Sequence, residues 1–424
     1  MNLVLLIKRN ITIILSLIVY RITLDYIYTD MIYPNFRYIG YKNEFSINTY
    51  VSSWIMLLIF SFLLIKMQKY KTNGALVISI LITVSAIPTT MIVAFYNTDS
   101  LFNILNIIYW YFVVFLYTKQ YKNIKIKQLR NYRSNMGVYF ITGFLFILLL
   151  FIGFFYTGFH FKLNLYDVYE VRNNFKASNI PMLLEYLFAS CIIIIPVILT
   201  YAICSGKKYL AFLALISQLL AFSIDGRKST ILILLLTVLG HFIIKKLEVN
   251  KIVCLVTFLT IAGLLEKLAF NTVILIDLII RRCLIVTAHL QFAYYDYFSF
   301  HEKDFFRQGI IGRFGFDSPY TMNIPDIIGN EYYLHGSYAN NGLFGDAYSN
   351  LGIIGVVILP ILITLALKYL DKVSLGLNQG LCLGIVLVSA YAFLSSSFFT
   401  VMLTHGFLIG CIVLNMIPRF TLNE

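Results

Sequence analysis

The chain has 424 residues, of which 59% are hydrophobic and 12% carry a charged side chain. Soluble domains average about 45–50% apolar and about 25% charged residues, so a soluble globular protein is excluded. The formal net charge is +13, but the basic residues lie mainly in short connections between apolar segments, where membrane topology and anionic lipid account for them. No nucleic-acid partner is expected.

Continuous apolar segments recur along the whole chain, and each has about the 20 residues with which a helix crosses a bilayer. They show no strand-like alternation, and backbone groups in hydrocarbon must be satisfied within the segment, so helices are expected. The sequence predicts an all-α polytopic transmembrane bundle that forms a single integral membrane domain, residues 1–424. The expected spans, about twelve, lie near 10–28, 47–65, 75–95, 101–118, 137–157, 181–203, 208–224, 229–244, 252–270, 342–367, 378–394 and 398–417.

Alternate connections between these spans carry most of the lysine and arginine, and 119–136 is the most basic of them. Because basic loops stay on the cytoplasmic side, we expect both termini to be cytoplasmic and 299–341 to be external. The first apolar segment follows Lys8 and Arg9 without a small-residue cleavage site after it, so it should remain as a span. The abundance of Ile, Asn, Lys, Tyr and Phe indicates an AT-rich bacterial genome, and hence the bacterial cytoplasmic (inner) membrane.

One connection, the external segment 271–341, is much longer than the others. Its first part, 272–298, has helical apolar spacing broken by charge. A charge at the bilayer centre costs roughly 2.5–3.5 kcal/mol, so we expect an interfacial or re-entrant helix here. Arg282, His289 and Asp296 recur every seven residues and fall on nearly one helical face. The sequence therefore predicts a polar stripe on an otherwise apolar helix.

The first candidate site is Ser223-Ile-Asp-Gly-Arg-Lys-Ser-Thr230, at the external start of the eighth expected span. Arg227 offers a planar fork that matches phosphate oxygens, and the helix start beyond it adds unpaired amides that favour an anion. The alternative is a pair of cations that marks the membrane interface with its long side chains. Because two cations run against the external charge bias, Arg227 is a candidate catalytic residue and Lys228 a candidate substrate-binding residue.

A second set of cations lies in the large loop, where an anionic lipid-linked substrate would need several of them. The alternative is solvated surface charge, paired with the acidic residues of the same loop. Asp277, for example, stands four residues before Arg281 on the expected helix and can pair with it. The set comprises Lys303, Arg307, Arg281, Arg282 and Arg313, and the last three are candidates for substrate binding.

His335 and Asp346 flank the return of the large loop to the membrane. A histidine there could act as a general base or hydrogen-bond a phosphate, although an isolated histidine is more often structural or simply exposed. His289 and His301 compete for that role. Aromatic side chains of the loop, such as Tyr338, could stack on sugar rings or belong to an interfacial belt. We take His335 and Asp346 as candidate catalytic residues and Tyr338 as a candidate substrate-binding residue.

Several motifs are absent from the sequence, namely Walker A, GxGxxG, HExxH and GxSxG. Their absence argues against ATP-driven, nicotinamide, zincin and serine-hydrolase chemistry. The cysteines show no CxxC spacing, so neither a disulfide framework nor a metal site is predicted. The second to ninth spans hold few ionisable residues at mid-depth, which argues against a proton-coupled transporter. No cofactor is expected.

Two short motifs and the layout of the spans indicate a family. The segment Ser223–Leu232 has a small-Arg-small pattern at the start of a mid-chain span. The segment Asn341-Gly-Leu-Phe-Gly-Asp-Ala-Tyr-Ser-Asn-Leu-Gly-Ile-Ile-Gly355 has a Tyr-x-Asn-Leu-Gly-x-x-Gly pattern after the large loop. In both motifs, and in having many spans with one large late loop, the chain resembles the bacterial O-antigen and capsule repeat-unit polymerases, the Wzy-type family of the O-antigen polymerase/ligase superfamily.

The resemblance implies a GT-C-like membrane glycosyltransferase that acts on the external face without a metal. It would polymerise oligosaccharide repeat units carried on undecaprenyl pyrophosphate into surface polysaccharide, with inversion at the anomeric carbon. Membrane lipid and, in the cell, chain-length regulator and flippase proteins would be its partners. Arg227 matches one of the family's functional arginines; Arg281, Arg282 and Arg313 are candidates for the other. His335 is placed like a histidine that O-antigen ligases carry before a late span.

Two other functions stay open. A lipid-linked oligosaccharide flippase also tends to have about twelve spans, but it should have short loops throughout, and the length of 271–341 argues against it. An O-antigen ligase-like glycosyltransferase would use nearly the same donor with a different acceptor. The residues do not separate it from a polymerase, although the fuller His-rich pattern of the ligases is missing here.

Overall fold

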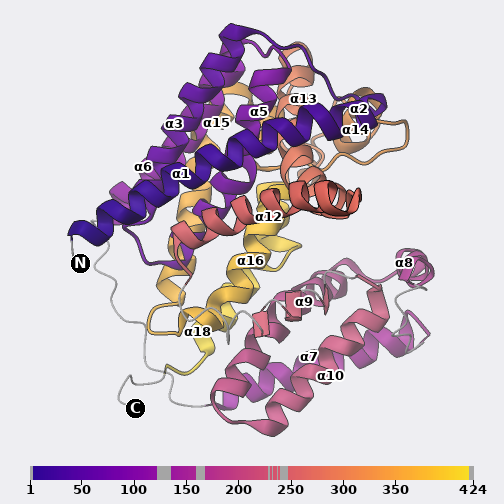
Figure 1. Ribbon diagram of the computed structural model, residues 1–424. Helices are drawn as coiled ribbons and strands as arrows, with labels where there is room; N and C mark the ends of the chain where they lie inside the picture. The colour runs from indigo at the N-terminus through magenta and orange to yellow at the C-terminus, as the bar shows by residue number, and fades with distance from the viewer. Residues whose placement is uncertain are drawn as a thin grey trace. The chain divides into compact units, whose positions relative to one another are not determined.

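The computed structural model describes residues 3–121, 135–158, 168–227, 230–231, 233–235, 237–238 and 247–419. Every regular element in these residues is helical, as the sequence predicts. Ten helical stretches in this part of the chain are long and apolar enough to cross a membrane. The protein is therefore a multi-pass helical membrane protein, and Figure 1 shows its helices.

The ten stretches coincide with ten of the predicted spans. A further predicted span, 378–394, is the shorter helix α16 (Gln379–Ser395), whereas 229–244 lies largely outside the described residues, as does most of the basic connection 119–136. The total of about twelve spans therefore stays a prediction. The ten stretches are Ile7–Ile39, Ile47–Met67, Asn73–Phe95, Ser100–Lys119, Met136–Phe155, Met182–Cys204, Lys208–Asp225, Val249–Phe270, Leu343–Val373 and Phe398–Met416.

The chain divides into two compact units. The first comprises residues 1–124, 248–367 and 393–398, and the second comprises 125–247, 368–392 and 399–424. Each unit is built from segments that are distant in the sequence and has its own buried residues. The single domain expected over the whole chain stays a prediction.

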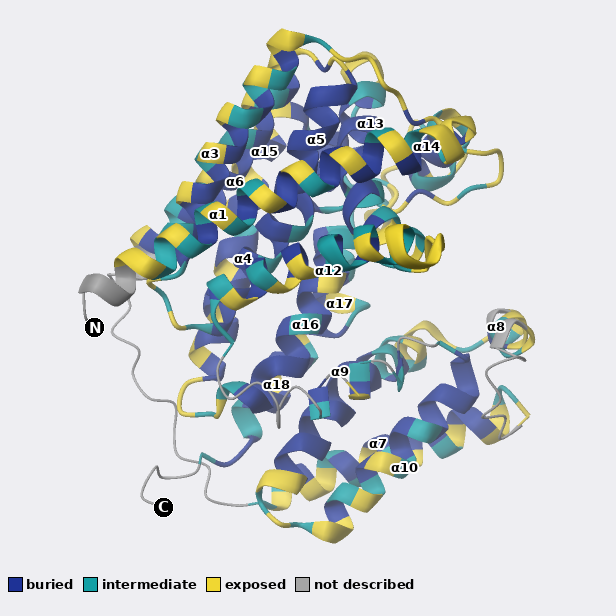
Figure 2. Cartoon of the chain, in the orientation of Figure 1, coloured by how far each residue is buried: buried dark blue, intermediate teal, exposed yellow. Residues whose placement is uncertain are grey.

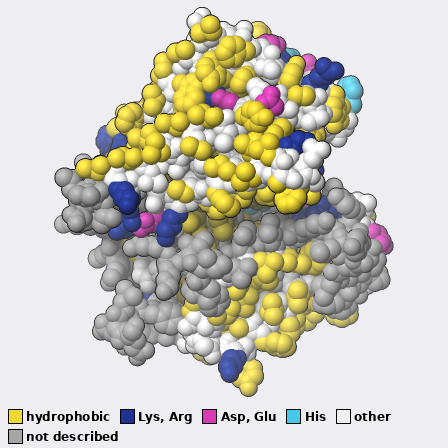
Figure 3. Space-filling model, in the orientation of Figure 1, with side chains coloured by type: hydrophobic (Ala, Val, Ile, Leu, Met, Phe, Trp, Pro, Cys, Tyr) yellow, Lys and Arg dark blue, Asp and Glu magenta, His cyan; other side chains and the backbone are white. Residues whose placement is uncertain are grey.

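The first unit is a bundle in which α1 packs on α12 and α3 packs on α5. In Figure 2, α5 is buried along its length, while α1 alternates between buried and exposed residues. Hydrophobic side chains cover much of the upper part of Figure 3, as expected for lipid-facing helices. The helices of this unit are α1 (Leu3–Ile27), α2 (Tyr33–Phe36), α3 (Ile47–Met67), α4 (Asn73–Leu81), α5 (Ile87–Phe95), α6 (Ser100–Tyr121), α12 (Val249–Phe270), α13 (Val286–Phe300), α14 (Ile324–Tyr332) and most of α15 (Leu343–Val373).

The predicted helix 272–298 is a π-helical segment, η4 (Ile276–Ile285), that continues into α13. The residues Ala288 to Tyr295 of α13 are all buried, and α13 contacts α5 and α14. Neighbouring helices therefore cover α13, and the interfacial or re-entrant position of this segment stays a prediction. In η4 the apolar side chain of Leu278 is exposed, as is that of Ile274 just before the segment begins.

A second π-helical turn, η3 (Ile82–Ala86), is fastened by side chains from other helices. A π turn leaves its carbonyl groups less regularly paired than an α-helix does. Three of these carbonyls lie within hydrogen-bonding distance of the Tyr20 hydroxyl, the Thr287 hydroxyl and the Gln291 amide. Gln291 also accepts a hydrogen bond from Asn106 at 2.9 Å. Inside a membrane protein such bonds hold helices together where lipid offers no alternative partner.

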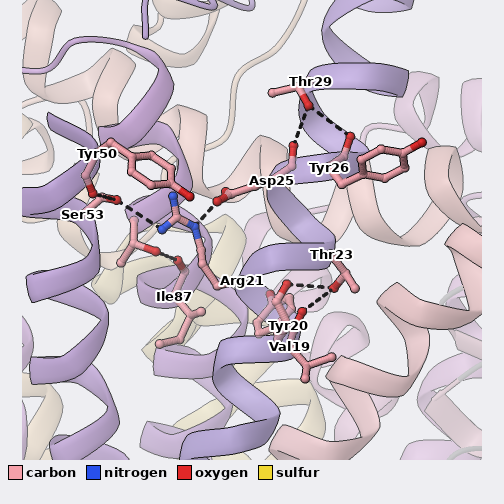
Figure 4. A network of polar contacts seen from close by, with 11 residues as sticks. Val19, Tyr20, Arg21, Thr23, Asp25, Tyr26, Thr29, Tyr50, Ser53 and Ile87 are labelled. Carbon is pink, nitrogen blue, oxygen red and sulfur yellow. Dashed lines mark hydrogen bonds and ion pairs between the residues drawn. The ribbon is translucent and has the colours of Figure 1, made fainter. Parts of the chain in front are cut away.

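A buried ion pair lies within α1, and its arginine also bonds to α3, as Figure 4 shows. Arg21 Nε donates to Asp25 Oδ1 at 2.8 Å, and Arg21 Nη1 donates to the Ser53 hydroxyl at 3.2 Å. The Arg21 guanidinium also lies over the Tyr50 and Trp54 rings, 5.9 and 5.6 Å from their centroids. Arg21 is fully buried, and an arginine in such a place persists only when its charge is paired.

The second unit contains α7 (Met136–Phe155), α8 (Val168–Ala177), α9 (Met182–Cys204), α10 (Lys208–Asp225) and α18 (Phe407–Met416). Helix α10 packs on both α9 and α7, α8 packs on α10, and α18 packs on α9. Gly406 precedes α18 in the left-handed region (φ +72°), and a Cβ there would lie 2.9 Å from the Ser190 Cα. Glycine is therefore required where α17 (Phe398–Leu403) turns into α18.

Candidate functional site

Arg227 follows α10, which ends in a left-handed Gly226 (φ +62°) that donates its N–H to the Phe222 carbonyl. This turn directs the Arg227 backbone N–H to Asp225 Oδ1 at 2.8 Å and places Arg227 Nε 3.3 Å from Asp225 Oδ2. Asp225 is 1% exposed, whereas the Arg227 side chain is 41% exposed. A buried carboxylate thus holds a guanidinium group that still faces outward.

Two more side chains of the second unit gather around this turn. The Asp225 carboxylate lies within electrostatic range of Arg172 on α8 as well as of Arg227. His405, between α17 and α18, lies within electrostatic range of Arg227. Two guanidinium groups therefore lie within electrostatic range of one buried carboxylate. Such an arrangement suits an anion with several oxygens, such as a phosphate or diphosphate.

The predicted partner of Arg227, Lys228, lies outside the described residues. Neither Arg172 nor His405 is among the residues predicted from the sequence. Arg172 carries a signal in the sequence, because it is a cation in a polar connection between two predicted spans. His405 carries no such signal, because only the turn before α18 places it beside residues almost two hundred positions earlier.

Two residues of the polar stripe, His289 and Asp296, form hydrogen bonds with other residues of the large loop. His289 Nδ1 lies 2.6 Å from the Tyr333 hydroxyl, and the Tyr332 hydroxyl donates to Asp296 Oδ2 at 2.6 Å. Burial, with the charge of Lys42 as a smaller cause, lowers the pKa of His289 to about 3, so the ring is neutral. Two successive tyrosines at the end of α14 therefore dock this loop helix on α13.

The two adjacent arginines of η4 differ in their surroundings. Arg281 pairs with Asp277 at 2.5 Å, and its guanidinium carbon lies 4.4 Å from the centroid of the Phe36 ring. Arg282 is exposed, and no hydrogen bond to it is found among the described residues. The ion pair occupies Arg281, so only Arg282 keeps its charged group open to a ligand.

His335, Tyr338 and Arg313 lie on the surface of the large loop. His335 and Tyr338 stand in the turn that follows α14, and both are exposed. Burial of part of the Tyr338 side chain and the charge of Asp326 raise its pKa. Arg313 is exposed in a short 3-10 turn, Gly312–Phe314. His335 and Tyr338 are therefore two exposed side chains that are close in the chain.

Asp346, in contrast, is fully buried. Its carboxylate accepts hydrogen bonds from the Phe398 backbone N–H at 2.7 Å, the Asn350 amide at 2.9 Å and the Asn341 amide at 3.3 Å. These bonds tie the first turn of α15 to the start of α17. A general base must reach the proton that it removes, so this geometry favours a positioning role for Asp346, and a catalytic role stays a prediction.

The Gly-rich motif 341–355 shapes the start of α15. Gly352 (φ +59°, ψ −138°) interrupts the helix, and a Cβ there would lie 3.0 Å from Lys303 Cε. A Cβ at Gly355 would lie 2.0 Å from the Ala347 carbonyl oxygen. The motif therefore produces a kink that only glycine allows.

Of the eight candidate residues, Arg227 and Lys228 belong to the second unit, and the other six belong to the first. In the first unit, Tyr294 lies within electrostatic range of both Tyr338 and Asp346. Comparison of the chain with models of known protein families, with curated proteins and with solved structures found no match in any of the three.

Proposed function

We propose that this protein is a GT-C-like membrane glycosyltransferase of the polysaccharide-polymerase type. It would join oligosaccharide repeat units carried on undecaprenyl pyrophosphate at the external face of the bacterial cytoplasmic membrane, with both termini in the cytoplasm. The product would be a surface polysaccharide such as O-antigen, capsule or exopolysaccharide. Chain-length regulator and flippase proteins are its proposed partners, and neither a metal nor a cofactor takes part in this proposal.

The observation that carries the proposal is the turn at Asp225–Arg227. A buried carboxylate fixes a half-exposed guanidinium group at the end of an apolar helix, and Arg172 adds a second positive charge within range. A lipid-linked diphosphate has its charge at the same boundary between apolar and polar surroundings. Fixed cations there would stabilise the negative charge that develops as the diphosphate leaves.

The proposed reaction is a single displacement. An acceptor hydroxyl oxygen forms a bond to the anomeric carbon of the donor sugar, while the bond from that carbon to the diphosphate oxygen breaks. The electron pair leaves with the diphosphate, and the hydroxyl proton passes to a base, for which the sequence offers His335 as the candidate. Because diphosphate is a good leaving group, positioning and charge neutralisation would supply most of the rate.

The test is to delete the gene in its own host and identify the lipid-linked intermediates. A polymerase defect leaves single repeat units on the external leaflet, because the flippase upstream still works. Units trapped on the cytoplasmic side would replace the proposal with the transport function. Polymer of normal length that is not attached to its final acceptor would indicate an O-antigen ligase-like activity instead.

A further inference from the structure

The large loop contains a strained turn at Phe305 and Phe306. Their φ angles are +55° and +59°, a region that residues with a Cβ rarely occupy. Two successive aromatic residues in this conformation persist only when the surroundings over-determine it, and such strain gathers at ligand-binding positions. This turn is therefore the strongest indication of a ligand site among the residues that the proposed function does not use.

Bonds on both sides hold the turn in place. The Phe306 N–H donates to Asn350 Oδ1 at 2.7 Å, and the Phe305 N–H donates to the Asn350 carbonyl oxygen at 3.1 Å. The buried Asp304 carboxylate accepts from the Gln308 N–H at 2.8 Å and from the Ser318 hydroxyl at 2.6 Å. Asn350 belongs to the Gly-rich motif of α15, so the motif positions this turn rigidly against the helix.

The turn presents an aromatic ring beside two polar side chains. The Phe305 side chain is 49% exposed, and the Arg307 guanidinium carbon lies 5.5 Å from the centroid of its ring. Arg307 Nη2 donates to Glu302 Oε1 at 2.7 Å, while the Glu302 side chain remains 61% exposed. The Arg307 guanidinium thus lies over one face of the half-exposed ring, with its acceptor Glu302 exposed next to it.

We propose that Phe305, with Glu302 and Arg307, binds a pyranose sugar ring. The C–H face of a pyranose packs on an aromatic face, and its equatorial hydroxyl groups reach charged donors and acceptors at the edge of the ring. The aromatic ring is held before the ligand arrives, so little entropy is lost on binding. That this sugar belongs to the acceptor chain rests on the proposed function, whereas the binding itself does not.

A membrane-inserted ring is the competing explanation for an exposed phenylalanine. The segment 302–308 reads Glu-Lys-Asp-Phe-Phe-Arg-Gln, so four charged side chains flank the two rings. Each charge disfavours entry into hydrocarbon. Exposed rings in this loop also include Phe300, the last residue of α13, which is 86% exposed. Phe300 therefore serves as a matched control outside the strained turn.

The test measures sugar binding directly, by saturation-transfer NMR on the full chain in lipid nanodiscs. The probes are the methyl β-pyranosides of glucose, galactose and N-acetylglucosamine. We expect ring C–H protons of at least one probe to receive saturation. Phe305→Leu should reduce that signal at least about fivefold, Phe305→Trp should keep it, and Phe300→Leu should leave it unchanged. Asn350→Ala should also weaken it, because it releases the turn without removing a contacting group.

Three outcomes would overturn the proposal: no saturation of any probe by the unmodified protein, an unchanged signal in Phe305→Leu, or equal losses in Phe305→Leu and Phe300→Leu. Quenching of the Trp of Phe305→Trp by lipids brominated in the acyl chain would instead place the ring in the bilayer. The nanodisc assay contains no lipid-linked donor. The protein could therefore bind sugar although its deletion accumulates no repeat units. That result would support the sugar site at Phe305 and refute the polymerase function.

Discussion

Two arginine–aspartate pairs of this protein differ in their surroundings. In the first unit, Arg21 pairs with Asp25 at 2.8 Å and is fully buried, with further contacts to Ser53 and two aromatic rings. In the second unit, Arg227 pairs with the buried Asp225 at 3.3 Å while 41% of its own side chain is exposed. The arginine of the first pair is fully enclosed and also bonds to a second helix, whereas the arginine of the second pair keeps its guanidinium group open to a ligand.

The histidines of the large loop differ in the same way. His289 is buried against Tyr333, while His335 is exposed after α14. The comparison shows that residue type alone does not separate structural from functional side chains, because the two arginines are of one type and so are the two histidines. Enclosure by the neighbouring helices separates them, and substitutions can test the distinction.

The largest effect is expected from Arg227→Ala. Loss of the cation that stabilises the leaving diphosphate should abolish polymer synthesis, with normal protein abundance in the membrane. Arg227→Lys should not fully restore activity, because a point charge cannot reproduce a planar fork. Polymer length and amount on gels are the readout. Arg9→Ala, which opens another arginine–carboxylate pair (2.9 Å to Glu248), is the control and should make normal polymer.

His335→Ala should lower turnover by about 10²–10⁴-fold if the imidazole takes the acceptor proton, and much less if it only orients the acceptor. The readout is accumulation of single lipid-linked repeat units in a complemented deletion strain. His301→Ala is the matched control, since His301 is also exposed but bonds the Tyr297 carbonyl at 2.7 Å. Equal turnover in the two variants would remove His335 from the reaction.

Arg21→Ala should act on stability instead. It leaves Asp25 buried without its partner, which should cost about 3–5 kcal/mol of unfolding free energy. The double variant Arg21→Met with Asp25→Leu removes both charges and should be much less harmful. Denaturant unfolding in detergent, with membrane abundance, measures both. If the single and double variants are equally stable, leaving Asp25 without its partner has no cost in unfolding free energy, which would contradict this prediction.

The smallest effect concerns His289 and pH. Folding lowers its pKa from the usual value near 6.5 to about 3, so the unfolded chain binds more protons between these values. Stability should be complete above about pH 6.5 and fall as the pH drops, by up to about 1.4 kcal/mol per pH unit. His289→Gln should show a shallower slope than the unmodified protein in unfolding experiments from pH 7 to 4.5. Parallel slopes would contradict the burial of a neutral ring.

Much of the second-unit site could be anticipated locally. Asp225, Gly226 and Arg227 are consecutive, and a glycine after an apolar run predicts a helix end with a left-handed turn. The contact between a buried carboxylate and the next arginine follows from that turn. Arg172 and His405 could not be placed, because their approach to Asp225 and Arg227 depends on how α8, α10 and α18 pack.

In the large loop, less of the structure could be predicted from the local sequence. The stripe of Arg282, His289 and Asp296 follows from helical periodicity, but the partners of its side chains do not. The sequence predicted only a polar stripe on an apolar helix, whereas the structure bonds two of its three members, His289 and Asp296, to Tyr333 and Tyr332. Those contacts join residues 36 and 44 positions apart, and no local pattern specifies such a pairing.

A multi-pass helical membrane protein could be predicted from the sequence, because bilayer thickness and the need to satisfy backbone groups impose long apolar helices. Which polar side chains are enclosed and which are exposed became clear from the packing of the helices. Asp346, Arg21 and His289 are enclosed by distant segments, whereas Arg227 and His335 remain exposed. Burial depends on neighbours far away in the chain, and their positions are set by the packing of whole helices rather than by any short stretch of residues.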